Sequence, residues 1–114
     1  MLARSGFAAP KSGVYDADMV ERSVWPKRGN PVPRYPSALQ DMRIEGDFVV
    51  RFVVDSTGTV PADKIEFPST VHRLFAEAVR AALLRSHYYP ASVAGHSVPQ
   101  QVVQEFRFLV GRRR

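Results

Sequence analysis

The side chains that could hold a metal or a cofactor are few, and their spacing suits neither. The only histidines are His72, His87 and His96. No two of them have the i, i+4 spacing of a helical metal site or place a glutamate between ligands as in the HExxH zinc motif. The chain has no cysteine, which excludes disulfides and thiolate ligands. We therefore expect surface or helix-capping histidines, no metal and no cofactor.

The residues that could serve nucleophilic catalysis are also poorly arranged. Ser56 stands in the run Ser-Thr-Gly, which is typical of a hairpin turn and differs from the G-x-S-x-G nucleophile elbow. Asp47 and Asp55 flank an apolar run, so we interpret them as polar groups at an edge and a turn. There is no glycine-rich phosphate loop. The sequence therefore argues against an enzyme and favours a protein that works by binding.

The charge raises the question of an anionic partner. The net charge is +5 and the pI about 10.1, a balance found in proteins that bind nucleic acid, lipid headgroups or acidic protein surfaces. Three of the charges are the terminal Arg112, Arg113 and Arg114. The other basic residues alternate with acids and form no stripe interleaved with aromatic residues. We expect no nucleic-acid partner, whereas the basic tail suits a membrane surface and an acidic protein equally well.

The length and composition indicate one small globular domain. The 114 residues are 45% hydrophobic and 24% charged, as in ordinary soluble domains. Residues 1–13 lack periodicity and are interpreted as an N-terminal arm, with the domain and its short basic tail at 14–114. No apolar run approaches the roughly 20 residues that span a bilayer. Residues 1–10 lack the apolar centre of a signal peptide.

The first third of the chain reads as an extended lead into the fold. Residues 14–25 have scattered apolar side chains and are expected to supply a short strand. Residues 26–36 contain four prolines and one glycine, so they should run extended over the surface. Residues 37–43 are long enough for about two helical turns, with Pro36 at the tolerated first position.

Two runs have the period of two that is typical of strands. In 48–54 (FVVRFVV), one face carries Phe48, Val50, Phe52 and Val54. In 101–110, Phe106, Phe108 and Val110 share one face, and Glu105 and Arg107 lie on the other. Asp55 to Gly58 supplies a turn, after which residues 60–67 return as a weaker strand that begins beside Pro61.

A long amphipathic helix is predicted after residue 68. Ser69 or Thr70 is expected to cap it, and Gly95 marks a later loop. Residues at helical spacing form one apolar stripe: Val71, Leu74, Phe75, Ala78, Val79, Ala82 and Leu83. The sum is an α+β fold in which a small antiparallel sheet of about three strands packs against one long helix, with a short leading helix. Phe52 and Phe75 are expected at the centre of the core.

Several short motifs stand in the order of a known family. They are Tyr35-Pro36, Ile44-Glu45-Gly46, Asp55 to Val60, Phe75 with its helix, Tyr89-Pro90-Ala91, Gly95 with Val98, and Phe106 with Phe108. Together they resemble the C-terminal domain of the TonB family, the periplasmic part of energy transducers that couple inner-membrane motors to outer-membrane transporters. The resemblance covers residues 14–110 and implies the same fold.

Two departures from the family pattern accompany the resemblance. Ser86-His87 stands where the family often has a tryptophan, which should loosen local packing without changing the fold. The membrane anchor and proline-rich spacer of the family are missing, so we expect either a fragment or a stand-alone form.

The resemblance implies a periplasmic, membrane-associated domain that binds protein partners. Family members bind a short segment of an outer-membrane transporter by strand addition, for energy-coupled transport. Carried over, the binding edge is the last strand, 102–110, flanked by residues that precede Pro36. The implied partner-binding residues are Val32, Arg34, Tyr35, Val102, Val103, Gln104, Glu105, Phe106, Arg107 and Phe108. An alternative for two of them is that Tyr35 packs in the fold and Arg34 is a solvated charge.

A second function is compatible with the same fold. Without its anchor, the domain would suit an accessory, structural subunit of a larger membrane protein complex, with residues 1–13 or the terminal arginines buried in a stable interface. An exposed sheet edge also permits a homodimer formed by strand exchange.

Overall fold

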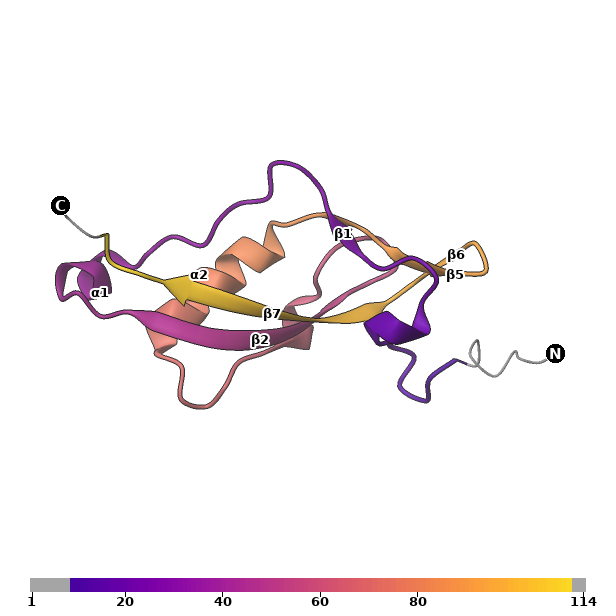
Figure 1. Cartoon of the computed structure of the whole chain (residues 1–114), viewed down its shortest axis with the longest axis horizontal. Coiled ribbons are helices and arrows are strands. Elements are labelled where there is room, and N and C mark those ends of the chain that lie inside the picture. Colours follow the sequence, from indigo (N-terminus) through magenta and orange to yellow (C-terminus); the bar gives the residue numbers. More distant parts are fainter. Residues whose placement is uncertain (1–8, 112–114) are drawn as a thin grey trace.

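The structure is a computed structural model that describes residues 9–111, so the first eight residues of the predicted arm and the three terminal arginines lie outside the described residues. Figure 1 shows an elongated molecule in which one helix lies across a narrow sheet. The elements are η2 (Ala17–Met19), β1 (Trp25–Pro26), α1 (Ser37–Asp41), β2 (Gly46–Val54), η3 (Ala62–Lys64), β3 (Ile65–Glu66), α2 (Arg73–Leu84), β4 (Tyr88–Tyr89), β5 (Ala91–Val93), β6 (His96–Val98) and β7 (Gln100–Phe108).

The main sheet has the order β3-β2-β7 and is antiparallel throughout. Strands β2 and β7 pair without a bulge from Gly46 opposite Phe108 to Val54 opposite Gln100. This confirms the two strands expected from their period of two. The strand predicted at 60–67 is much shorter, because Pro61 leads into the 3-10 turn η3 and only the two residues of β3 reach β2.

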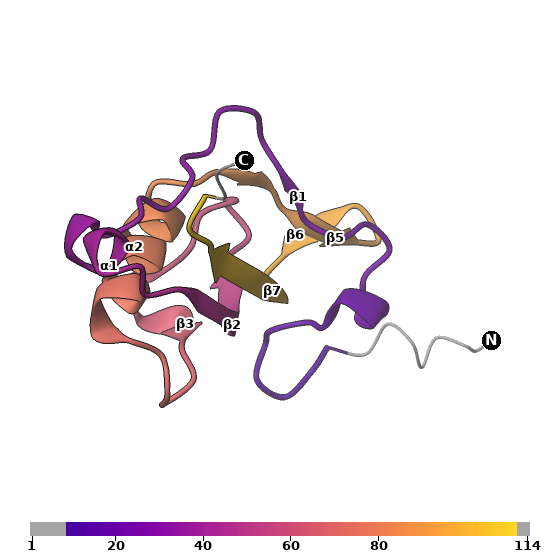
Figure 2. The ribbon, with the colours of Figure 1, turned by 60° about the vertical axis from the view of Figure 1, so that its left-hand side comes forward.

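Helix α2 packs on one face of this sheet (Figure 2), which confirms the long helix. Its apolar stripe is confirmed from Leu74 to Leu83, whereas Val71 lies before the helix and packs against the core from there. Phe75, Val79, Ala82 and Leu83 are its buried residues. The predicted cap was wrong. The backbone N–H of Val71 donates to the carbonyl of Pro68 at 3.2 Å, a turn that places Ser69 and Thr70 outside the helix. His72 is the N-cap, and its Nδ1 accepts the Leu74 N–H at 3.0 Å.

The core lies between α2 and the facing side chains of β2 and β7. Phe52 and Phe75 are among its most completely buried side chains, as expected from the sequence. The Phe75 ring stacks on Phe108 with 4.4 Å between centroids. Gly46 leaves room for Phe75, because a Cβ added to that glycine would lie 2.7 Å from the ring. Large apolar side chains buried in this way contribute about 1.5–3 kcal/mol each.

The lead into β2 is largely as predicted. The chain from residue 27 to 36 has no regular structure and runs over the surface, and it is followed by α1. This helix ends at Asp41, two residues before the predicted end, because Arg43 adopts a positive φ of 58° that α-helix excludes.

The end of the molecule opposite α1 holds short strands that the sequence analysis did not anticipate (Figure 1). β1 pairs with β4, and β5 pairs with β6 across a turn in which Ala94 and Gly95 have φ of 51° and 81°. Two positive φ values are typical of a type I′ hairpin. The strand expected at 14–25 is limited to isolated bridges of Tyr15 and Arg22 before β1.

Within residues 9–111, no helix has the length and apolar character needed to span a membrane. The same residues contain no cluster of three potential metal ligands.

Candidate functional site

Strand β7 presents an open edge on the side away from β2. At its start, the N–H of Gln101 donates to the carbonyl of Tyr15 at 2.8 Å, and the N–H of Tyr15 donates to the carbonyl of Pro99 at 2.9 Å. Backbone groups alternate in direction along a strand, so the N–H and C=O groups of Val103, Glu105 and Arg107 also point away from β2. Among residues 9–111, no backbone group pairs with these three.

The side chains of β7 divide between the two faces of the sheet. Val102, Phe106 and Phe108 face α2 and pack against the core, with Gln104 in the same row. Val103, Glu105 and Arg107 point to the other face and are exposed. There, the Arg107 Nε lies 3.2 Å from Glu105 and 3.4 Å from Asp47. These pairs are more than half exposed, so they add little stability.

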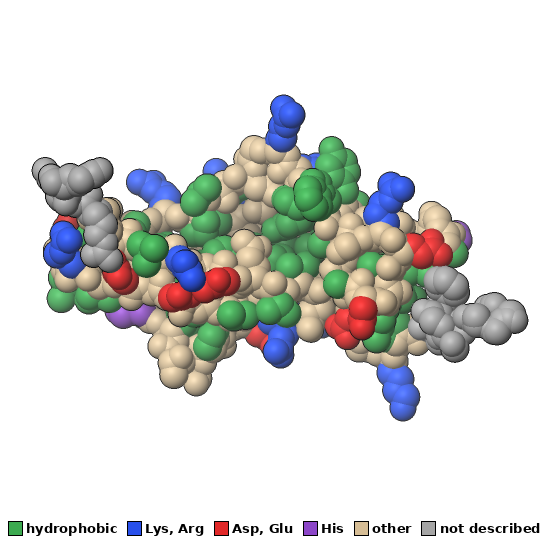
Figure 3. Space-filling view, in the orientation of Figure 1, with side chains coloured by type: hydrophobic (Ala, Val, Ile, Leu, Met, Phe, Trp, Pro, Cys, Tyr) green, Lys and Arg blue, Asp and Glu red, His purple; other side chains and the backbone are tan. Residues whose placement is uncertain are grey.

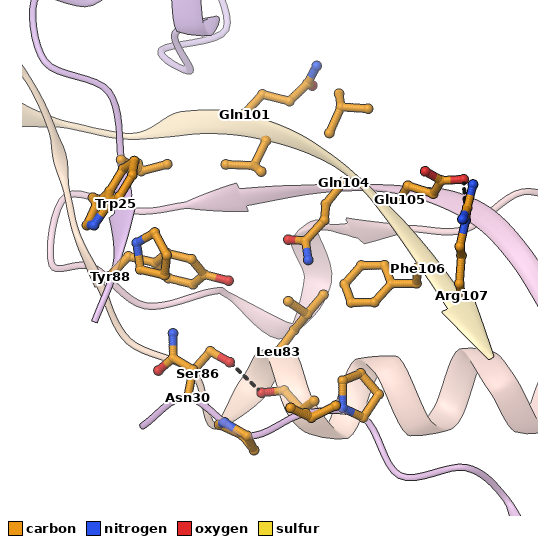
Figure 4. A pocket seen from close by; sticks show the side chains of 18 of the residues that line it. Trp25, Asn30, Leu83, Ser86, Tyr88, Gln101, Gln104, Glu105, Phe106 and Arg107 are labelled. Atoms are coloured by element: carbon orange, nitrogen blue, oxygen red, sulfur yellow. Dashed lines mark hydrogen bonds and ion pairs between the residues drawn. The ribbon is translucent and has the colours of Figure 1, made fainter. Parts of the chain in front are cut away.

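A groove of about 1060 Å³ runs beside the open edge. One wall is β7, and the opposite wall is an extended segment, residues 23–35, which we call the strap. Leu83 and Ser86, in and just after α2, contribute to the floor (Figure 4). Hydrophobic side chains gather in the hollow between β7 and the strap (Figure 3). The groove therefore joins an apolar interior to a row of free backbone groups.

Side chains close the groove at both ends by tying the strap to the sheet. At one end, the Gln100 Oε1 accepts hydrogen bonds from the Ser23 hydroxyl and the Val24 N–H, each at 3.0 Å. At the other end, the Tyr35 ring meets the Phe108 ring edge-on at 5.5 Å. The space between these two contacts corresponds to residues 102–107 of β7.

The middle of the strap is held by the pairing of β1 with β4, by the Lys27 N–H, which donates to the carbonyl of His87 at 3.0 Å, and by Asn30. The Asn30 carboxamide donates to the carbonyl of His87 at 2.9 Å and accepts its N–H at 2.8 Å, in the manner of a strand pair. The following residues, 31–34, make no hydrogen bond within the described part of the chain, and Pro31 and Pro33 have no N–H to donate. This stretch of the strap is the least restrained wall of the groove.

Aromatic side chains lie beside the groove where β1 meets β4. Trp25 is 70% exposed and its neighbour in the pairing, Tyr89, is 57% exposed. The Lys27 ammonium lies 5.0 Å from the centre of the Tyr89 ring. Exposed aromatic residues at a groove are typical of protein-binding surfaces, where they supply contact area at low entropic cost.

The two tyrosine hydroxyls of the groove are neutral at physiological pH. Burial raises the pKa of Tyr35; the charge of Glu45 acts in the same direction and that of Arg43 acts against it. Burial likewise raises the pKa of Tyr88, although a hydrogen bond with Ser86 lowers it in part. Both hydroxyls can therefore donate hydrogen bonds, and Tyr35 does so within the fold.

The structure brings together nine of the ten residues that the resemblance implied for partner binding. They line the groove: Val32, Tyr35, Val102, Val103, Gln104, Glu105, Phe106, Arg107 and Phe108. Arg34 does not. Arg34 borders a second, smaller hollow between the strap and α2. Whether these residues contact a partner stays a prediction.

Sequence reasoning missed other residues that shape the groove: Ser23, Trp25, Asn30, Ser86, Tyr88 and Gln100. Trp25 is the only tryptophan of the chain, and its place before a proline-rich surface segment was a usable signal. No local sequence signal identified Gln100, because its role comes from contacts with residues more than seventy positions away.

Comparison with known proteins bears on what such a groove does. A family model described as the Gram-negative bacterial TonB protein C-terminal matches residues 31–110. The chain is also similar to the solution NMR structure of the TonB C-terminal domain from Pseudomonas aeruginosa, with 29% sequence identity and a TM-score of 0.65. That match covers 81% of this chain and 91% of the other. No curated protein sequence matches this chain.

Proposed function

Because this chain belongs to the TonB C-terminal family of Gram-negative bacteria, we propose that its β7 edge binds a segment of an outer-membrane transporter by strand addition, for energy-coupled transport. The family consists of non-enzymatic interaction domains of the periplasm. The chain is accordingly a TonB-like periplasmic domain and not an enzyme. The transporter as partner, the energy coupling and an association with the membrane belong to the proposal.

The observation that carries the proposal is the open edge of β7. The three outward-facing residues Val103, Glu105 and Arg107 offer their N–H and C=O groups beside an apolar groove. An extended peptide that pairs with them gains main-chain hydrogen bonds from the edge and side-chain contacts from the groove. At about 3.4 Å per residue, residues 102–107 match a partner segment of about six residues.

The groove also explains why the edge is not simply an aggregation site. The strap stands opposite β7, and the ties of Gln100 and Tyr35 close the two ends. A partner must therefore enter as a single extended strand between β7 and the strap. Two copies of this chain that paired their β7 edges would have to displace the strap, so we favour a peptide segment over a homodimer.

Proline substitution at the edge tests the proposal. In Val103→Pro the outward N–H is lost, and the inward hydrogen bonds of β7 to β2 stay intact because Val103 does not make them. The matched control is Val103→Ala, which removes the side chain and keeps the N–H. The probe is a synthetic peptide with the N-terminal periplasmic segment of a transporter from the same bacterium, titrated by calorimetry.

We expect Val103→Pro to abolish measurable binding and Val103→Ala to retain it, with both variants folded by circular dichroism. Equal affinities of the two variants for the peptide would contradict strand addition at β7. Analytical ultracentrifugation of the free protein, with a monomer expected, tests the preference for a peptide over a homodimer.

The second candidate, a structural subunit of a membrane complex, rests on residues 1–13 and the terminal arginines as contacts, most of which lie outside the described residues. Purification from native membranes in mild detergent separates the two functions. A transporter that a competing peptide releases would support strand addition. Recovery at fixed stoichiometry with inner-membrane subunits would support the structural role.

A further inference from the structure

We infer that Gln104 selects the central side chain of the added segment, which must be a hydrogen-bonding residue (Ser, Thr, Asn or Gln) between two apolar ones. The inference rests on the strand addition proposed above and names the chemistry of the segment that the groove accepts. It follows from the polarity of one row of side chains on β7.

This row faces the groove and includes Val102, Gln104 and Phe106. Gln104 is the polar residue between these two apolar ones, and its partner across the sheet is the fully buried Val50. Figure 4 shows the Gln104 carboxamide pointing into the groove on the side of Leu83, with no hydrogen bond to the residues drawn. Gln104 is exposed in the free protein, so its amide is open to solvent.

Gln100, four residues earlier in the same row, has the same side chain in a covered setting. The strap lies over it and leaves it only 3% exposed. Its Oε1 accepts hydrogen bonds from the Ser23 hydroxyl and the Val24 N–H. The segment that covers Gln100 therefore supplies two hydrogen-bond donors to its side chain, one from a hydroxyl group and one from the backbone.

A segment added to β7 would cover Gln104 as the strap covers Gln100. In an antiparallel pairing, the added segment would form its hydrogen bonds with the backbone of Val103 and Glu105, because the backbone groups of Gln104 point toward β2. The residue opposite Gln104 would therefore belong to a non-hydrogen-bonded pair. In such pairs the Cα atoms are only about 4.5 Å apart and the side chains are closest. That residue is thus the one that displaces water from the Gln104 amide.

Displacing this water without replacing its hydrogen bonds is unfavourable, because a covered polar group without a partner keeps the full cost of desolvation. A hydroxyl or carboxamide side chain opposite Gln104 avoids this loss, and an aliphatic one does not. The neighbouring inward positions meet Val102 and Phe106, which favour apolar side chains. The pattern of the segment is therefore apolar, polar, apolar at alternate positions.

The test is a selection from a displayed library of random nine-residue peptides against the folded wild type, Gln104→Val and Gln101→Val. Gln101 is the matched control, because it is the same residue on the same strand and its side chain leaves β7 on the opposite side from Gln104 (Figure 4). We expect the wild type and Gln101→Val to enrich the apolar–polar–apolar pattern. Gln104→Val should enrich an apolar centre.

The best wild-type peptide is then compared with its analogue that has valine at the centre. We expect this change to weaken binding to the wild type by about tenfold or more and to leave binding to Gln104→Val unchanged or stronger. If peptides are enriched but the wild type and Gln104→Val prefer the same central residue, the role of Gln104 is overturned and strand addition stands. If the wild type enriches no extended peptide, strand addition itself fails, and this inference with it.

Discussion

The Tyr35 hydroxyl donates a hydrogen bond of 2.5 Å to the carbonyl of Ile44, nine residues later. The ring of the same tyrosine meets the Phe75 and Phe108 rings edge-on, at 5.8 Å and 5.5 Å. One side chain thereby joins the end of the strap, the start of β2 and the core. Tyr35 is a packing residue of the fold as well as a wall of the groove.

This relationship predicts that Tyr35→Phe affects stability and spares binding. The substitution removes the hydroxyl and leaves the Ile44 carbonyl without its donor, which should cost about 1 kcal/mol of unfolding free energy. Because the hydroxyl is already used within the fold, affinity for the transporter peptide should not change. Urea unfolding and calorimetric titration check the two statements. Normal stability with an affinity loss of tenfold or more would mean that the hydroxyl contacts the partner.

A second prediction concerns the turn between β2 and η3. Gly58 has a φ of 89°, and a Cβ added to it would lie 2.2 Å from the carbonyl oxygen of Tyr88. Gly58→Ala should therefore lower the unfolding free energy by more than about 2 kcal/mol, through both the backbone strain and the clash.

Gly29→Ala is the matched control for this variant. Gly29 has a similar φ of 84° but nothing within 4 Å of its Cβ position, so it should lose only the strain contribution of about 1 kcal/mol. Equal losses in the two variants, measured by denaturant unfolding, would exclude the contact with Tyr88 as a cause.

A third prediction is that the unfolding free energy depends on pH through Asp55, which lies in the same turn. Burial raises the pKa of Asp55, but hydrogen bonds from Thr57 and Thr59 outweigh it and hold that pKa below its usual 3.8. A carboxyl with a lowered pKa in the folded state contributes stability that is present above the unfolded-state pKa and is lost as pH falls through the folded-state pKa.

Unfolding free energy should therefore decrease as the pH is lowered from about 5 to about 3, and Asp55→Asn should flatten this decrease. Asp47→Asn serves as a control, because its carboxyl makes only an exposed ion pair on the sheet surface. The same acid slope in Asp55→Asn as in the wild type would assign it to other carboxyls.

A fourth prediction concerns the strap. Asn30→Ala removes both hydrogen bonds to the His87 backbone but no buried contact, so global stability should change by less than about 1 kcal/mol. The strap should open more often, and the Lys27 amide, which donates to the same His87 carbonyl at 3.0 Å, should exchange faster with deuterium. Unchanged exchange at Lys27 would show that β1 and β4 alone hold the strap.

The sequence predicted those parts of the fold that depend on local patterns. The alternation in 48–54 and 101–110 and the apolar stripe from Leu74 to Leu83 each reflect one element that packs against one core. The hairpin of β5 and β6 was missed because its turn is Ala94-Gly95, in which alanine takes a positive φ usually reserved for Asn, Asp or Gly.

The candidate site was predictable only in part. The edge strand followed from periodicity and from the family resemblance. The depth of the groove did not, because it depends on how far the strap stands from β7. That separation is set by Asn30 with His87 and by Ser23 with Gln100, contacts between residues 57 and 77 positions apart. No local pattern encodes such pairs.

The most direct test of the account is amide hydrogen exchange along β7, measured by NMR with and without a saturating transporter peptide. Strand addition at β7 predicts fast exchange at Val103, Glu105 and Arg107 in the free protein and strong protection of these three amides in the complex. Val102, Gln104 and Phe106, which pair with β2, should be protected in both states. If the three outward amides stay unprotected when the peptide is bound, the β7 edge is not the binding site.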